Sequence, residues 1–153
     1  MDDVYSSLHI KGNHWVAMWI SIPTRHVVLW DSIVKHARAA EIEAAVRPIC
    51  EIVPYVLNIL AVGDDKANWP TTPFTHERET KVPQKMQSGD CGVYCLKYIE
   101  CHSLGFGFPS ELCDANVKMI REKLASDVFD ETQIRGTEVR DYSALDMYDS
   151  KRG

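Results

Sequence analysis

The sequence has 153 residues, of which 45% are hydrophobic and 25% are charged, the composition of an ordinary globular protein. A chain of this length buries about 70% of the surface that its unfolded form exposes, so it needs no disulfide or metal to form a core. We expect one domain over residues 1–153, with a loosely ordered tail at 133–153. The net charge of −5 disfavours nucleic acid as a partner.

Neither a membrane span nor a signal peptide is predicted. The longest strongly apolar stretch, residues 48–62, contains Glu51, Pro54 and Asn58 and is shorter than the roughly 20 apolar residues that a span requires. The first residues are acidic where a signal peptide would be basic. We therefore expect an intracellular protein that does not contact membranes.

Two strands joined by a turn are the first elements predicted. Residues 14–20 and 26–30 are apolar runs rich in β-branched and aromatic residues, and residues 21–25 between them contain Pro23. Neither run alternates cleanly between apolar and polar residues. Both faces of this ribbon are therefore expected to be covered, at least one of them by helices.

The rest of the chain is predicted to be mainly helical. The expected helices cover residues 32–46, 49–62, 93–102 and 110–128. Asp31 or Ser32 caps the first helix, and Pro54 is expected to kink the second or to open a new helix. Residues 66–83 are rich in proline and predict a surface connection with one short extended piece near Phe74. The predicted fold class is α+β, with a small, mainly antiparallel sheet packed against helices.

The five cysteines are expected to be free thiols, because their number is odd and an intracellular compartment is reducing. Zinc is an alternative for four residues that lie close together in the sequence: Cys95, Cys101, His102 and Cys113. Their spacing contains no Cys-x-x-Cys pair, so this metal pattern is weak. We expect no cofactor.

Cys91 is placed where a thiol can react. A polar loop ends at Asp90-Cys91-Gly92 and a buried helix is predicted to follow, which puts the Cys91 sulfur at the helix N-terminus. Unpaired amide groups and the positive end of the helix dipole favour a thiolate at that position, and the first helical amides can also hold an oxyanion. The alternative is that Cys91 is a small buried hydrophobic residue, as free cysteines often are.

His14 and Asp31 are the candidates for a base and its orienting acid. A thiolate nucleophile needs a proton acceptor, commonly a histidine held by a carboxylate. If the hairpin turn is centred near Ile22 and Pro23, residues whose numbers sum to 45 face each other, and His14 lies opposite Asp31 at a Cβ separation of about 5 Å. A slip of one residue would put the two side chains on opposite faces. The alternatives are a histidine with a local hydrogen bond and an aspartate that caps a helix.

Together these residues resemble a known family. His14-Trp15 opens one predicted strand, Asp31-Ser32 follows the next, and Pro83-Gln84 precedes the Ser-Gly-Asp-Cys-Gly-Val-Tyr motif at residues 88–94. Their types and order are similar to those of the cysteine proteases that process SUMO and other ubiquitin-like proteins. The closest likeness is to plant members, including those carried by transposable elements, and it covers about residues 4–129.

The resemblance implies a papain-like core of the adenoviral and SUMO protease type. In that core Cys91 would be the nucleophile, His14 the general base, and Asp31 the group that orients His14. The reaction would be thiol-dependent cleavage of a ubiquitin-like protein after its C-terminal glycines. A nuclear or cytoplasmic location follows, with a leaning towards the nucleus.

The resemblance also implies an oxyanion donor and a substrate channel. Gln84 lies seven residues before Cys91, whereas six is the usual spacing in SUMO proteases, where this sequence has Lys85. Gln84 is therefore expected to donate to the oxyanion, with Gln87 as the alternative. Trp15 would form a wall of the narrow channel that admits a Gly-Gly terminus.

The family has a largely helical segment before its histidine strand, whereas only 13 residues precede His14 here. We therefore expect an N-terminally truncated fold, with apolar surface near Trp15, Trp19 or Trp30 left for a partner or a missing segment to cover. One alternative function is a catalytically impaired module that only binds a ubiquitin-like protein. A lower-ranked alternative is an acyltransferase on a related fold.

Overall fold

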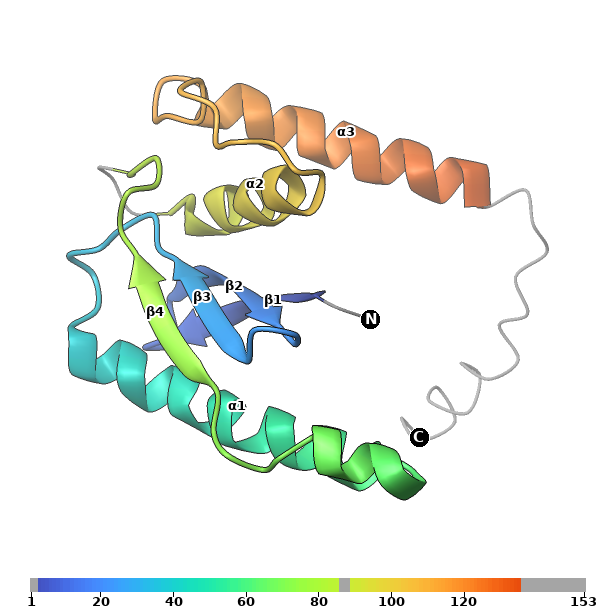
Figure 1. The fold of residues 1–153 in the computed structure, drawn as a ribbon. Helices are drawn as coiled ribbons and strands as arrows, with labels where there is room; N and C mark the ends of the chain where they lie inside the picture. The colour runs from blue at the N-terminus through green and yellow to red at the C-terminus, as the bar shows by residue number, and fades with distance from the viewer. Residues whose placement is uncertain (1–2, 86–88, 136–153) are drawn as a thin grey trace, which may run out of the picture. The chain divides into compact units, whose positions relative to one another are not determined.

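The structure, a computed structural model, describes residues 3–85 and 89–135, which belong to two compact units that meet in sequence after Val117. The first unit contains a four-stranded sheet and two α-helices (Figure 1). Its elements are β1 (Asp3–Ile10), β2 (His14–Ser21), β3 (His26–Trp30), α1 (Ala39–Leu60), the 3-10 helix η1 (Gly63–Asn68), β4 (Thr75–Glu79) and α2 (Cys91–Ser103).

The sheet has the strand order β1-β2-β3-β4. Strands β1 and β3 both run antiparallel to β2, whereas β4 runs parallel to β3. The α+β class with a small, mainly antiparallel sheet is therefore confirmed. Strand β1 was not predicted, and it pairs with β2 along its whole length, from Asp3 opposite Ser21 to Ile10 opposite His14.

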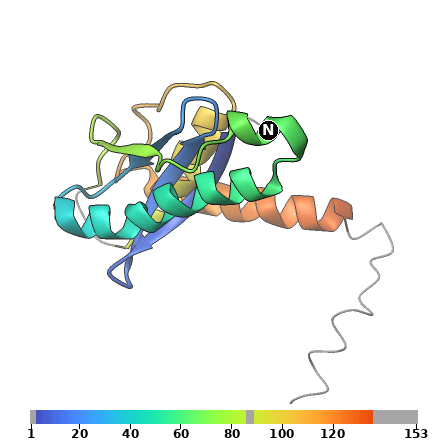
Figure 2. The same ribbon diagram turned by 60° about the horizontal axis from the view of Figure 1, so that its bottom comes forward.

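The two helices cover opposite faces of the sheet, as Figures 1 and 2 show from two directions. On one face, Val16 and Met18 of β2 belong to the same buried cluster as Ile42 and Val46 of α1. Side chains alternate across a strand, so the residues between them point to the opposite face, where β2 contacts α2. The prediction that both faces of the ribbon are covered is confirmed.

The β2–β3 hairpin has a register different from the predicted one. Ala17 pairs with Trp30 and Ser21 with His26, so paired numbers sum to 47 rather than 45. The reason is the turn, which closes when the amide of Arg25 donates to the carbonyl oxygen of Ile22 at 3.2 Å, with Arg25 at a φ of 53°. A shift of two residues leaves each side chain on its predicted face, because the side-chain period of a strand is two.

Helix α1 replaces the two helices predicted at 32–46 and 49–62. It begins at Ala39 and uses neither predicted cap, because the Asp31 carboxylate binds His14 and Arg78, and the Ser32 hydroxyl has no hydrogen-bond partner among the described residues. The backbone amide of Arg38 instead donates to the Glu41 carboxylate at 2.7 Å. Pro48 and Pro54 both lie inside the helix, which continues through them. The expectation that Pro54 opens a new helix is therefore wrong.

The proline at position 54 has a visible consequence for the sheet. Because Pro54 has no N–H group, the carbonyl of Cys50 one turn earlier lacks its helical donor. The amide of Phe74 donates to that oxygen at 2.9 Å. Thr75, the next residue, begins β4, the extended piece that was predicted near Phe74. The hydrogen bond between Phe74 and the Cys50 carbonyl thus links helix α1 to the start of strand β4.

Helix α2 lies close to its predicted bounds, and α3 (Val117–Arg135) begins seven residues later than predicted. Turns precede α3, with the amide of Leu112 donating to Pro109 at 3.1 Å and that of Asn116 to Cys113 at 3.0 Å. Apart from Val117, α3 belongs to the second unit. Residues 136–153 of the predicted tail lie outside the described residues. In the described part of the chain, no helix is both long and apolar enough to cross a membrane.

Candidate active site

The ends of two adjacent strands bring an imidazole and a carboxylate together. His14 is the first residue of β2, and Asp31 directly follows β3. Both are buried, with 1% and 0% of their surfaces exposed. His14 Nε2 and Asp31 Oδ1 lie 2.8 Å apart, at hydrogen-bond distance. The contact forms although the two residues are not directly opposite, because the observed register keeps them on one face.

The Asp31 carboxylate has partners on both oxygens. The amide of Ile33 donates to Oδ1 at 2.8 Å, and Nη2 of Arg78, from β4, donates to Oδ2. Burial alone would raise the pKa of Asp31, but the hydrogen bonds from His14, the Ile33 amide and Arg78 outweigh it and hold that pKa below its ordinary value. Asp31 is thus kept as an anion. Arg78 was not singled out in the sequence.

The second ring nitrogen of His14 is buried as well. Among the described residues, Nδ1 of His14 has no hydrogen-bond partner. The ring also contacts that of His36, with centroids 4.7 Å apart, and His36 Nε2 lies 3.0 Å from Asn13 Oδ1. One nitrogen of His14 is therefore held by Asp31, and the other is left without a partner in the described part of the chain.

Cys91 is the first residue of α2, so its sulfur lies at a helix N-terminus. The residue is 7% exposed, and its Sγ accepts a hydrogen bond from the backbone amide of Trp15 at 3.5 Å. Trp15 is the neighbour of His14, so the sulfur touches the backbone that carries the imidazole. Helix α2 is held in this place by its contacts with β2.

Trp15 stands at the surface beside this sulfur. It is 41% exposed, and its ring stacks on that of His9 from β1 with centroids 4.4 Å apart. A Cβ atom built on Gly92 would lie 3.9 Å from Cδ1 of Trp15, which is an ordinary contact distance. Trp15 therefore flanks the first turn of α2 and is open to solvent on one side.

The structure places Gln84 next to Asp31. Its side-chain amide donates to the carbonyl oxygens of Asp31 at 2.9 Å and of Val82 at 3.2 Å, and its Oε1 accepts the Val34 amide at 3.4 Å. The amide that was expected to face an oxyanion is thus engaged with backbone carbonyls. The alternative donor, Gln87, lies outside the described residues.

Lys85 is a buried cation near the start of α2. Its Nζ lies 2.8 Å from Asp90 Oδ2 and 3.4 Å from Asp114 Oδ1. The Tyr94 hydroxyl also donates to Asp114 at 3.1 Å. Burial, followed by the Asp114 carboxylate, raises the pKa of Tyr94. The Lys85 charge is therefore matched by carboxylates, one of which belongs to the residue before Cys91.

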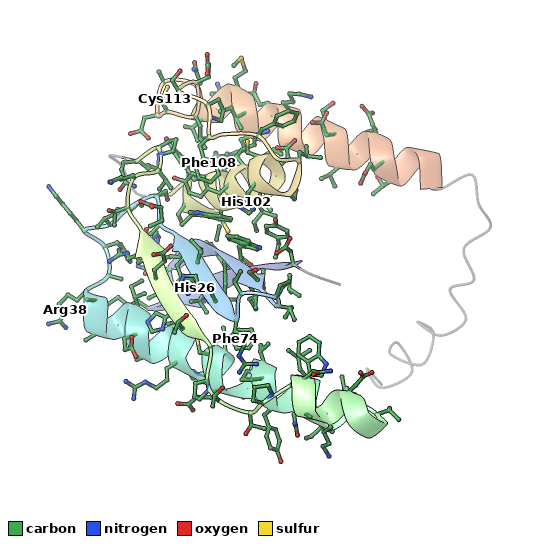
Figure 3. The ribbon with its side chains drawn as sticks, in the orientation of Figure 1. His26, Arg38, Phe74, His102, Phe108 and Cys113 are labelled. Carbon is green, nitrogen blue, oxygen red and sulfur yellow. The ribbon has the colours of Figure 1, made fainter. Side chains whose placement is uncertain are left out.

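His102, the histidine of the alternative zinc site, is engaged with aromatic side chains of the sheet. His102 lies on the side of α2 that faces the sheet (Figure 3), with its ring 4.3 Å from that of Trp19 and 4.7 Å from that of Trp30. Its Nδ1 is 2.8 Å from the Tyr5 hydroxyl, and burial lowers its pKa. No cluster of three or more metal-ligating side chains occurs in the part of the chain that the structure describes.

The arrangement has several of the parts that thiol-based acyl transfer uses, although no hydrogen bond joins Nδ1 of His14 to the Cys91 sulfur. A sulfur at a helix N-terminus lies beside the backbone of a histidine whose imidazole is oriented by a buried, ionised carboxylate. The first amides of a helix have no acceptor within the helix and can donate to a developing oxyanion.

Comparison with known proteins gives one family and one fold. The profile of the Ulp1 protease family, C-terminal catalytic domain, matches residues 1–135. Among solved structures, the SUMO protease Ulp1 with its catalytic cysteine oxidised to a sulfenic acid is similar at 17% identity and a TM-score of 0.58, over 82% of this chain and 51% of that one.

A second solved structure, the C-terminal Ulp1 protease domain in complex with Smt3, the yeast ortholog of SUMO, is similar at 16% identity and a TM-score of 0.54. The match covers 79% of this chain and 49% of that one. The chain therefore spans about half the length of the solved structures that it matches, and at these identities the likeness concerns the fold. No curated protein matches the sequence.

Proposed function

The chain belongs to the Ulp1 protease family, C-terminal catalytic domain, and from this premise we propose that it cleaves a ubiquitin-like protein of the SUMO type after its C-terminal glycines. The observation that carries the proposal is the buried His14–Asp31 contact of 2.8 Å, together with the hydrogen bond that the backbone amide of Trp15, the next residue of β2, donates to the Cys91 sulfur. The likeness to plant and transposon-associated members stays a prediction from the sequence.

In the proposed reaction, His14 takes the thiol proton of Cys91 as the sulfur attacks the carbonyl carbon of the terminal glycine. The tetrahedral intermediate collapses to a thioester, and His14 returns the proton to the leaving amine. Water, activated by His14, then hydrolyses the thioester and frees the thiol. Asp31 keeps the imidazole in the orientation that both steps require.

The oxyanion would be held by the first amides of α2 together with a glutamine. Gln84 is the proposed donor, and Gln87 is its alternative. To donate to the oxyanion, Gln84 must leave the carbonyls of Asp31 and Val82. Trp15, exposed beside Gly92, is proposed to flank the glycine tail of the substrate.

A SUMO-type partner is supported by the solved Ulp1 domain that is in complex with Smt3 and shares this fold. As a member of this family, the chain is a cysteine protease. Because it spans about half of that structure, turnover by this chain is itself part of the proposal.

The proposal is tested with a SUMO-type probe that carries an electrophile at its C-terminal glycine. The wild-type chain is expected to form a covalent adduct, which Cys91→Ala and His14→Ala abolish. The matched control is Cys113→Ala, which removes the partly buried thiol of a loop and should keep the adduct. An adduct that survives in Cys91→Ala would contradict the assignment, and tight binding with no adduct would favour the binding module.

A further inference from the structure

Arg78 reaches the acid of the candidate site from a strand that is distant in sequence. Strand β4 runs parallel to β3, and Arg78 pairs in register with Leu29, two residues before Asp31. Paired residues of neighbouring strands point to the same face of a sheet. The Arg78 side chain therefore lies on the face of His14 and Asp31, and it is only 15% exposed.

The guanidinium has three acceptors, all in the segment that follows β3. Its Nη2 donates to Asp31 Oδ2 and, at 2.8 Å, to the carbonyl oxygen of Val34. Its Nη1 donates to the carbonyl oxygen of Ala37 at 3.1 Å. One side chain thus bridges the carboxylate and two backbone positions of residues 31–37.

These contacts fix the direction in which the Asp31 carboxylate points. Oδ1 is taken by His14 and the Ile33 amide, and Oδ2 by Arg78. Rotating the carboxylate away from His14 would break the hydrogen bond to the cation. The same segment carries His36, whose ring contacts that of His14, so its backbone position also affects the other side of the imidazole.

We propose that Arg78 is a positioning residue for the cleavage reaction, because it holds Asp31 towards His14 and fixes the backbone of residues 31–37. This inference rests on the function proposed above. Arg78 acts through Asp31 and has no contact with the reacting atoms in the proposed reaction.

The charge of Arg78 supplies a signature that a purely structural role would lack. The described ionisable groups around Asp31 are His14 from β2, His36 through its contact with His14, Arg78 from β4 and Tyr98 from α2. Arg78 is the permanent cation among them, and it helps to hold the pKa of Asp31 below its ordinary value. Without Arg78, burial of the carboxylate is less well opposed, and the pKa of Asp31 rises.

The experiment compares Arg78→Gln, Arg78→Lys and the wild-type chain in turnover of a SUMO precursor and in a carbon-13 NMR titration of the Asp31 carboxyl group. We expect Arg78→Gln to lower kcat at least about tenfold with KM within about twofold. The Asp31 midpoint should rise measurably above the wild-type value. The acid limb of the activity profile should move to higher pH with it.

Arg78→Lys separates charge from geometry. A lysine keeps the cation but cannot bond the carboxylate and both carbonyl oxygens in the planar fork of arginine. The Asp31 midpoint should therefore stay near the wild-type value, while kcat recovers only in part. The matched control is Arg47→Gln, which removes an arginine that is paired with Glu43 at 3.0 Å on the surface of α1. It should leave kcat and the Asp31 midpoint unchanged.

Two results would overturn the inference. One is wild-type kcat in a folded Arg78→Gln chain, and the other is an unchanged Asp31 midpoint in that variant. If Arg78→Gln does not fold, Arg78→Lys decides, because full wild-type kcat in the lysine variant would refute the bridging role. The titration needs no substrate, so a wild-type chain that cleaves no ubiquitin-like protein would refute the proposed function and still leave the charge effect of Arg78 measurable.

Discussion

Lys85 is a buried cation whose contacts lie close to the start of α2. Its ammonium group is buried between Asp90 and Asp114. A buried ion pair contributes little net stability, but removing one partner leaves an uncompensated charge in a poorly solvated place. Since Asp90 precedes Cys91, this contact ties the Lys85 side chain to the residue before the start of α2.

Replacing Lys85 with methionine is expected to lower the free energy of unfolding by about 3 kcal/mol, because Asp90 and Asp114 lose their buried countercharge. Urea denaturation measures the change. The matched control is Lys123→Met, which breaks a lysine–aspartate pair of 2.9 Å on an exposed helix and should change stability little. Equal losses of unfolding free energy in the two variants would show that burial does not make the Lys85 ion pair more important for stability than an exposed pair.

At the level of single residues, the sequence identified the groups with local signals. Cys91 stands before a helical pattern, and His14 and Asp31 flank strands at a fixed spacing. The structure brings these three to one end of β2. Arg78 could not be found in the same way, because it reaches Asp31 only through the parallel pairing of β3 and β4. The sequence predicted the extended piece near Phe74 but not the parallel pairing that brings Arg78 to Asp31.

Helix α1 shows how packing overrides a local rule. Proline in a helix interior removes a hydrogen bond and crowds the preceding turn, which predicts a break at Pro48 or Pro54. Here the helix buries Ile42, Val46 and Cys50 on one line, against the sheet, and that burial favours one continuous helix. The predicted start of this helix was also wrong, because the Asp31 carboxylate binds His14 and Arg78 and does not cap the helix.

The two prolines should respond differently to replacement. Pro48 is exposed, so Pro48→Ala restores a helical hydrogen bond and should stabilise the chain by about 1–3 kcal/mol. Pro54 is buried, and in Pro54→Ala the new amide would compete with Phe74 for the Cys50 carbonyl oxygen. We expect Pro54→Ala to give no gain, as measured by urea denaturation. A gain as large as that of Pro48→Ala would mean that the Phe74 contact contributes nothing.

For the molecule as a whole, the exposed apolar surface differs from the one expected around three tryptophans. Trp15 is exposed, but Trp30 is buried, with rings of Trp19, His102 and Phe108 against it. Further exposed apolar residues lie along α1. These residues follow helical spacing and are Ile52, Tyr55, Val56 and Ile59. A surface of this kind favours association at high concentration.

Placing a lysine in this stripe should weaken self-association. Val56→Lys or Ile59→Lys is expected to reduce the concentration dependence of the sedimentation coefficient, while adduct formation with the SUMO-type probe stays at the wild-type level. Ala44→Lys is the matched control, since it adds the same charge at an exposed position of α1 outside the stripe. If Ala44→Lys has the same effect, net charge rather than the apolar stripe is responsible.

The sequence separations within the site imply an order of assembly during folding. The partners of the histidine–aspartate contact are 17 residues apart, whereas the arginine comes from 47 residues beyond the aspartate and the sulfur from 76 residues beyond its amide donor. Closing a longer loop costs more chain entropy, so the hairpin can form well before the parallel strand and the cysteine helix dock. A nascent chain that has made only the hairpin therefore has the proposed base but not the proposed nucleophile, and the proposed activity would arise only when the last long-range contacts close.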